Sequence, residues 1–152
     1  MKFDHKITAI LAAGFFAAAL AGCDNKKDLS RTFTNANGEE GVTFTYFYKD
    51  DTILRQDTES KIIYKSMGAA NAGQARISIE PMIDHYAGIK GATYRADYQE
   101  NAVILQISVD FTQVKESDLC RLQGKDAGCE KPSLSMAESA EHRLAQGFKE
   151  VK

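Results

Sequence analysis

The recurrence of apolar residues at every second position in two segments constrains the fold most. The alternating residues are Val42, Phe44, Tyr46 and Tyr48 in the first segment, and Val103, Leu105, Ile107, Val109 and Phe111 in the second. Alternation with a period of two places the apolar side chains on one face of an extended chain, so each segment predicts a strand with one buried face. Strands of this kind are typical of an antiparallel sheet that is covered on a single side.

The segments around them complete the predicted sheet and its cover. Strands are expected at residues 31–36, 42–48, 53–65, 94–98 and 103–111, and helices at 71–88, 116–122 and from 133 or 135 to 147. Asn37-Gly38 favours a tight hairpin between the first two strands. Because the strands follow one another along the chain, we predict a single α+β domain over residues 31–152. It has an antiparallel sheet of about five strands with two to three helices packed on one face.

Capping residues mark the helix starts. Asn71 with Gln74, and Ser135 with Glu138, have the spacing of an N-cap and its partner three residues later. Pro81 lies inside the first predicted helix, where its missing amide hydrogen is expected to kink or divide the helix.

Length and charge limit the class of protein. The chain has 152 residues, of which 43% are hydrophobic and 26% charged, with a net charge of −2. These values are ordinary for one globular domain. Nucleic acid is not an expected partner, because proteins that bind it usually carry a clear excess of basic residues.

The N-terminal segment has the layout of a signal peptide. Lys2 and Lys6 precede an apolar run of 14 residues, Ile7–Leu20. As a helix this run is about 21 Å long, which is shorter than the ~30 Å hydrocarbon core of a bilayer. The run ends in Leu20-Ala-Gly-Cys23, which resembles the lipobox of bacterial lipoproteins.

The lipobox resemblance implies processing at Cys23. We expect residues 1–22 to be a signal peptide that is cut between Gly22 and Cys23, and the cysteine to carry a lipid anchor; two or more acyl chains hold a protein stably to a membrane. Residues 23–30 then form a polar tether, whose segment Asp24–Ser30 spans ~15 Å. The expected location is the cell membrane on its periplasmic or extracytoplasmic side. Asp24 favours retention in the inner membrane of a Gram-negative cell.

Two cysteines remain after acylation of the first. Cys120 and Cys129 have eight residues between them, and an oxidising compartment favours a disulfide. A redox-active pair is the alternative, but the spacing is not that of a Cys-x-x-Cys motif.

The remaining candidates for chemistry are few. His85 and His142 occur in no metal-binding spacing, so we expect no metal and no cofactor. No catalytic serine or cysteine motif is present, so no catalytic residue is assigned. Tyr46, Tyr94 and Tyr98 are expected to be exposed and are a candidate ligand surface, although aromatic packing between strands also explains tyrosines of this kind.

The whole chain resembles the YehR-like family of small bacterial lipoproteins. The resemblance rests on Leu20-Ala-Gly-Cys23, on Thr32–Gly38 leading into Val42–Tyr46, on Tyr98–Asn101 through Val109–Phe111, and on Gly147–Lys152. It implies an α+β domain on a lipid anchor. The family is uncharacterised, so the resemblance transfers no active site.

Two function classes follow from these observations. The first is a non-catalytic binding or structural module at the cell envelope, whose partners are the membrane and an envelope protein or small ligand. The alternative is a small envelope enzyme, a hydrolase with a site around His85 or His142. We expect the first, because the sequence shows none of the usual catalytic signatures.

Overall fold

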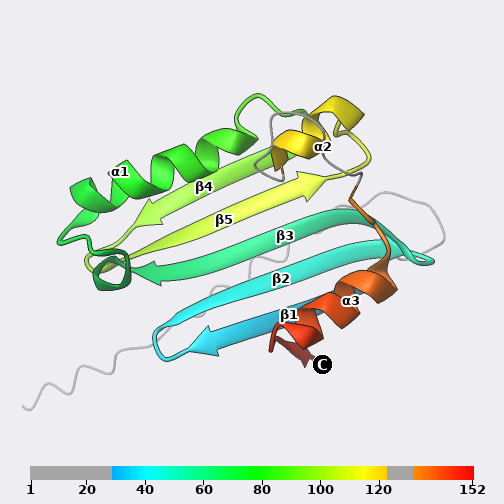
Figure 1. The fold of residues 1–152 in the computed structure, drawn as a ribbon, viewed down its shortest axis with the longest axis horizontal. Helices are drawn as coiled ribbons and strands as arrows, with labels where there is room; N and C mark the ends of the chain where they lie inside the picture. The colour runs from blue at the N-terminus through cyan, green and yellow to red at the C-terminus, as the bar shows by residue number, and fades with distance from the viewer. Residues whose placement is uncertain (1–28, 123–131) are drawn as a thin grey trace, which may run out of the picture.

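The computed structural model describes residues 29–122 and 132–152. Their strands form one antiparallel sheet in the order β4-β5-β3-β2-β1-β6 (Figure 1). The strands are β1 (Leu29–Asn37), β2 (Glu40–Lys49), β3 (Thr52–Ile63), β4 (Ala92–Tyr98), β5 (Ala102–Asp110) and β6 (Lys149–Val151). The predicted α+β class is confirmed, with six strands where about five were expected.

Three α-helices and two short 3-10 helices complete the described part of the chain. These are η1 (Tyr64–Met67), α1 (Ala72–Ile83), η2 (Asp84–Tyr86), α2 (Glu116–Leu122) and α3 (Met136–Ala145). The expected N-caps are confirmed, because Asn71 accepts a hydrogen bond from the amide of Gln74, and Ser135 accepts one from the amide of Glu138. Within the described ranges, no helix is both long and apolar enough to span a bilayer.

The strand register places the apolar side chains on one face of the sheet. Residues directly opposite each other in an antiparallel pair share a face. Phe33 pairs with Phe44, and Tyr46 pairs with Gln56, which pairs with Val109. Helices α1 and α3 cover this face at opposite sides, α1 near β4 and β5 and α3 near β1 and β2 (Figure 1).

The core on this helical face consists of two clusters. One cluster joins α1 to β5 and contains Tyr64, Ala75, Ile79, Ile83, Val103 and Leu105. The other joins α3 to β1, β2 and the start of β3, and contains Phe33, Tyr46, Ile53, Met136 and Ala140. Neither cluster covers the middle of this sheet face.

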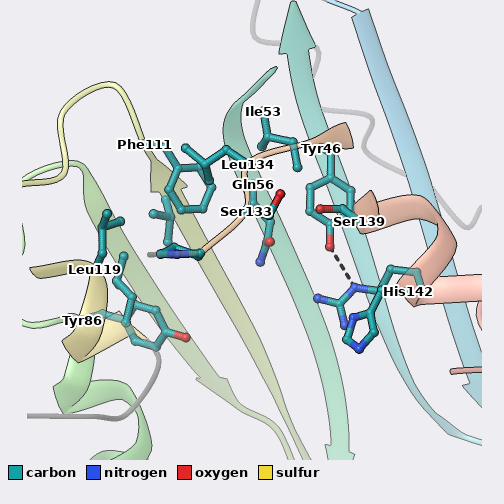
Figure 2. Close-up of a pocket in the computed structure, with 14 residues that line it drawn as sticks. Tyr46, Ile53, Gln56, Tyr86, Phe111, Leu119, Ser133, Leu134, Ser139 and His142 are labelled. Carbon is teal, nitrogen blue, oxygen red and sulfur yellow. Dashed lines mark hydrogen bonds between the residues drawn. The ribbon is translucent and has the colours of Figure 1, made fainter. Parts of the chain in front are cut away.

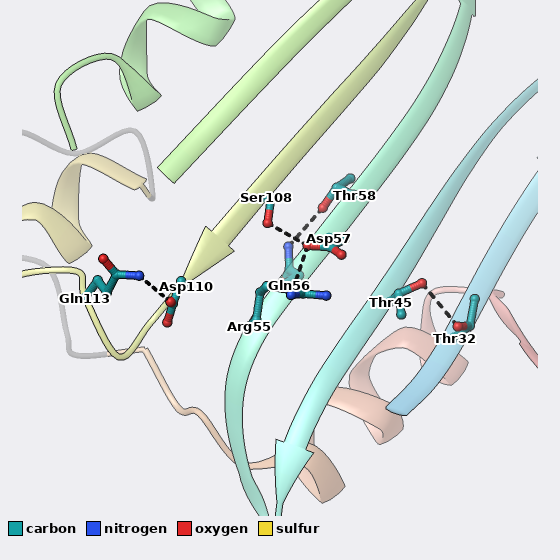
Figure 3. A network of polar contacts seen from close by, with 9 residues as sticks. All are labelled: Thr32, Thr45, Arg55, Gln56, Asp57, Thr58, Ser108, Asp110 and Gln113. Carbon is teal, nitrogen blue, oxygen red and sulfur yellow. Dashed lines mark hydrogen bonds and ion pairs between the residues drawn. The ribbon is translucent and has the colours of Figure 1, made fainter. Parts of the chain in front are cut away.

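The opposite face of the sheet is polar, and its side chains bond to each other (Figure 3). The hydroxyls of Thr32 and Thr45 lie 3.1 Å apart, and Ser108 donates to Asp57 at 2.6 Å. Asp57 also forms an ion pair with Arg55, at 3.2 Å. No helix is needed over this face because it has few apolar side chains to bury.

Two local expectations were wrong, and one strand was missed. The third strand ends at Ile63, because Tyr64 turns into η1 and is buried against α1. The first helix ends at Ile83, two residues after Pro81. Strand β6 was not predicted; it pairs with β1, where Arg31 donates through two nitrogens to Glu150 at 2.8 Å each.

Candidate functional site

A pocket of about 440 Å³ lies on the helical face, between the side of the sheet covered by η2 and α2 and the side covered by α3. Its lining residues are Tyr46, Ile53, Gln56, Tyr86, Val109, Phe111, Leu119, Leu122, Pro132, Ser133, Leu134, Ser139, His142 and Arg143. Figure 2 shows them around the strands that form the floor. The volume is in the range of small-molecule sites, which is ~300–1,000 Å³.

One end of the pocket is apolar. Leu119 and Leu122 come from α2, Tyr86 comes from η2, and Phe111 follows β5. Arg121 holds α2 in place because its guanidinium donates to the carbonyl of Ala87, at 3.2 Å. Tyr86 is half-buried here, and this burial raises the pKa of its hydroxyl.

The other end of the pocket presents a cation, Arg143 of α3. Its Nε donates to the hydroxyl of Tyr46 at 2.8 Å, and its Nη1 donates to Gln146 at 2.9 Å. The guanidinium carbon lies 3.7 Å from the centre of the Phe44 ring. These contacts fix the guanidinium, and within the described ranges none of the ion pairs involves Arg143.

The β2–β3 turn positions α3 over the sheet. The Asp51 carboxylate accepts from the Ser135 hydroxyl at 2.6 Å and from the Ala137 amide at 2.9 Å. The Met136 amide donates to the Asp51 carbonyl at 2.8 Å. The bonds from Ser135 and Ala137 lower the pKa of Asp51, so the carboxylate is charged where it holds the first turn of α3.

The polar face carries a second hollow of about 730 Å³, lined by residues of β2 to β5. Most of its polar side chains have partners, as in the bond from Gln106 to Glu59 at 3.0 Å and the bond from Ser108 to Asp57. The pocket on the helical face is the better candidate site because it combines a cation held in place by its neighbours, Arg143, with an apolar wall.

The structure separates the three tyrosines that were predicted to form a ligand surface. Tyr46 is 3% exposed, so its expected exposure was wrong; its ring packs in the core and its hydroxyl reaches Arg143. Tyr94 is 39% exposed on β4. Tyr98 packs against the α1 cluster beneath the guanidinium of Arg76, and burial raises the pKa of its hydroxyl.

The two candidate histidines also lie apart. His85 is exposed on η2 and does not line the pocket. His142 lines the polar end, and its Nε2 lies 3.4 Å from the side-chain nitrogen of Gln146. Among the described residues there is no group of three or more metal-ligating side chains.

The predicted processing sites and one cysteine of the predicted disulfide lie outside the described residues. Gly22, Cys23, Asp24 and Cys129 lie outside the described residues, and Cys120 lies half-buried on α2. Lipidation, cleavage, sorting and the Cys120–Cys129 disulfide therefore stay predictions.

Sequence reasoning missed the cation of the site. Arg143 follows the buried Ala140 by three residues, a spacing that puts both on one face of a helix. Alternation likewise puts Phe44 and Tyr46 on the covered face of the sheet. The helix spacing indicates that Arg143 points towards the sheet, and the alternation indicates which face of β2 is covered. Only the fold brings α3 to β2.

Comparisons with known proteins agree with this fold. The family model described as "Protein of unknown function (DUF1307)" matches residues 29–149. The chain is 34% identical to the uncharacterized lipoprotein YehR of Escherichia coli (strain K12), over 100% of both chains. It is 30% identical to the uncharacterized lipoprotein Lmo0207 of Listeria monocytogenes serovar 1/2a (strain ATCC BAA-679 / EGD-e), over 99% of both.

Two solved structures are similar. The NMR structure of the E. coli YehR protein has a TM-score of 0.72 and 29% identity, and the match covers 85% of this chain and 94% of that one. An NMR structure of a protein from Streptococcus pneumoniae TIGR4 has a TM-score of 0.59 and 16% identity over 99% of both chains, which shows a shared fold alone.

Proposed function

Because this chain belongs to the DUF1307 family and is a relative of the lipoprotein YehR, we propose that it is a lipid-anchored envelope protein that binds an amphipathic anion without catalysis. Support for the anchor comes from Leu20-Ala-Gly-Cys23 and from the lipoprotein names of its relatives. In this proposal Cys23 carries the lipid on the extracytoplasmic side, and Asp24 favours the inner membrane of a Gram-negative cell.

Arg143 is the observation that carries the binding proposal. A guanidinium held by Tyr46, Gln146 and the Phe44 ring has little freedom left to lose when a ligand binds. The guanidinium has no carboxylate partner within the described ranges. In this proposal the anionic group of the ligand is its partner. Hydrogen bonds to charged groups contribute about 1.5–3 kcal/mol.

The two ends of the pocket define the ligand class. The anionic group lies at Arg143, and an apolar body extends over Phe111 towards Leu119. Apolar surface removed from water contributes about 25 cal/mol per Å². A ligand with only one of these two parts gains only one of the two contributions.

Calorimetry with octanoate and with 1-octanol tests the proposal. The sheet, the helices and both clusters lie in residues 29–152, so the mature domain is expected to fold without its signal peptide. Octanoate is expected to bind at least ~10-fold more tightly than 1-octanol, and Arg143→Gln to remove this preference, since ~1.4 kcal/mol corresponds to tenfold. Equal binding of the two probes would contradict the proposal.

Arg76→Gln is the matched control. The guanidinium of Arg76 lies 4.0 Å from the centre of the Tyr98 ring, much as that of Arg143 lies over Phe44, but Arg76 does not line the pocket. This variant is expected to bind octanoate as the unchanged protein does. If Arg143→Gln and Arg76→Gln lose affinity for octanoate equally, the loss comes from a general effect on folding or net charge and not from the pocket.

A hydrolase is the second candidate, because Ser139 and His142 both line the pocket. They are three residues apart on α3 and share a face of the helix. A general base needs a partner that orients its ring, and the partner of His142 within the described ranges is the amide of Gln146. This observation favours binding over catalysis.

His142→Gln separates the two candidates. A binding protein keeps its octanoate affinity within about twofold, since the cation and apolar walls remain. Hydrolysis of p-nitrophenyl octanoate is measured alongside, with His85→Gln as the control for a histidine outside the pocket. Turnover that His142→Gln abolishes and His85→Gln leaves unchanged would establish the hydrolase.

A further inference from the structure

The tether enters the fold beside the floor of the pocket. Leu29, the first residue of β1, pairs with Tyr48 of β2, and Tyr48 pairs with Ile53 of β3. Neighbouring strands are ~4.8 Å apart, so the backbones of Leu29 and Ile53 are separated by about 10 Å. Ile53 lines the pocket.

The rest of the floor lies at the same end of the sheet. Arg31 of β1 pairs with Tyr46, which pairs with Gln56, and Gln56 pairs with Val109. This row is two residues further along β1, a rise of about 7 Å. Tyr46, Gln56 and Val109 all line the pocket. The floor therefore extends over the first rows of a sheet whose β1 strand has nine residues.

The tether is short. Five residues lie between Cys23 and Leu29, so their α-carbons are six steps apart along the chain, and a flexible chain of that length has a root-mean-square span of about 15 Å. Even fully extended, it reaches only about 20 Å. A lipid on Cys23 therefore keeps the pocket floor within about 30 Å of the membrane surface.

We infer that the ligand is a membrane amphiphile with a single acyl chain and an anionic group, taken from the bilayer that holds the anchor. This inference rests on the proposed function and adds the source and the chemical class of the ligand. A single chain fits because the pocket has one cation and one apolar end in a volume of about 440 Å³. Leu29, 54% exposed, presents an apolar side chain where the tether joins β1.

The anchor raises the concentration of such a ligand at the pocket. An amphiphile in the same bilayer is confined to a layer that the tether holds close to the binding site, and effective concentration falls as a linker lengthens. A ligand from solution gains nothing from this arrangement. The two sources therefore differ in how binding responds to the length of the tether.

Photolabelling of the lipidated full chain tests the inference. The protein is placed in phosphatidylcholine vesicles that contain palmitate with a photoreactive diazirine, and is irradiated briefly. Label is expected on peptides with Phe111, Leu119 or Leu134, which line the pocket. A flexible Gly/Ser insert of about 30 residues after Lys27 is expected to reduce labelling by about threefold or more.

The controls separate tether length from other effects. The same insert after Lys152 changes the mass and composition equally and is expected to leave labelling unchanged. Arg143→Gln is expected to reduce labelling, and Arg76→Gln to preserve it. Cys23→Ser is expected to lose both detergent partitioning and labelling, which checks the anchor itself.

Three outcomes would overturn the inference. They are label outside the pocket, equal labelling by a photoreactive two-chain phosphatidylcholine, and labelling unaffected by the insert after Lys27. If octanoate still binds in calorimetry, such a result rejects the membrane source or the single-chain class of the ligand and leaves the proposed function standing. If octanoate does not bind, the proposed function itself has failed.

Discussion

A single carboxylate, Asp51, connects the β2–β3 turn to the first turn of α3. Its pKa is lowered by the hydrogen bonds from Ser135 and Ala137. A carboxyl group whose pKa is lower in the folded state stabilises the fold above its unfolded pKa, ~3.9, and this contribution is lost as the pH falls through the folded pKa. The attachment of α3, and with it the position of Arg143, therefore weakens in acid.

Thermal unfolding as a function of pH measures this effect. Asp51→Asn is expected to lower the melting temperature at pH 7 and to flatten its decline between about pH 5 and pH 2. Asp110 and Glu150 also have lowered pKa values and remain in the variant. The effect of Asp51 is therefore the difference in melting temperature between the variant and the unchanged protein at each pH.

Asp50→Asn is the control, because it removes the neighbouring carboxylate. Asp50 has a φ of 55°, which asparagine adopts readily. Its pH profile is expected to match that of the unchanged protein. A profile for Asp51→Asn that also matches would show that the hydrogen bonds to α3 contribute nothing in solution.

At the scale of elements, α2 is one of the short elements that form the site. It has seven residues and buries only Leu119, yet it supplies one wall of the pocket. A disulfide from Cys120 to Cys129 would close a loop of about ten residues, worth roughly 2–3 kcal/mol in the chain-entropy model. We expect this bond to hold α2 against the chain that follows it.

Alkylation before and after reduction, followed by intact-mass measurement, tests the disulfide. Freshly exported protein is expected to take up no reagent at Cys120 and Cys129 until it is reduced. Replacing both cysteines by serine is then expected to weaken octanoate binding more than Arg76→Gln does. Two thiols that alkylate freely without reduction would refute the pairing.

Elements with their own local signal were predictable from the sequence. Alternation predicted the long strands, and the caps at Asn71 and Ser135 predicted where two helices begin. Strand β6 has no such signal, because Lys149–Val151 is exposed and becomes a strand only by pairing with β1. The apolar Met82 of α1 is 54% exposed, because Ala75, Ile79 and Ile83 form the buried row.

At the scale of the whole molecule, the site exists because the core is divided. The α1 cluster and the α3 cluster lie on opposite sides of the same sheet face, and the pocket lies between them. Strand patterns predict that this face is covered, but not that two helices leave a gap between them. The bond from Arg143 to Tyr46 joins residues 97 positions apart, so no local pattern contains it.

The neighbouring position of the first and last strands sets the order in which the domain can be completed. Strand β1 is made first, yet its outer edge stays unpaired until Lys149–Val151 arrives and Glu150 meets Arg31. A ribosome or an export channel delivers the chain from its N-terminus, so those residues emerge after the other strands of the sheet. The sheet therefore cannot be completed before Lys149–Val151 have emerged, whereas its first strand emerges long before them.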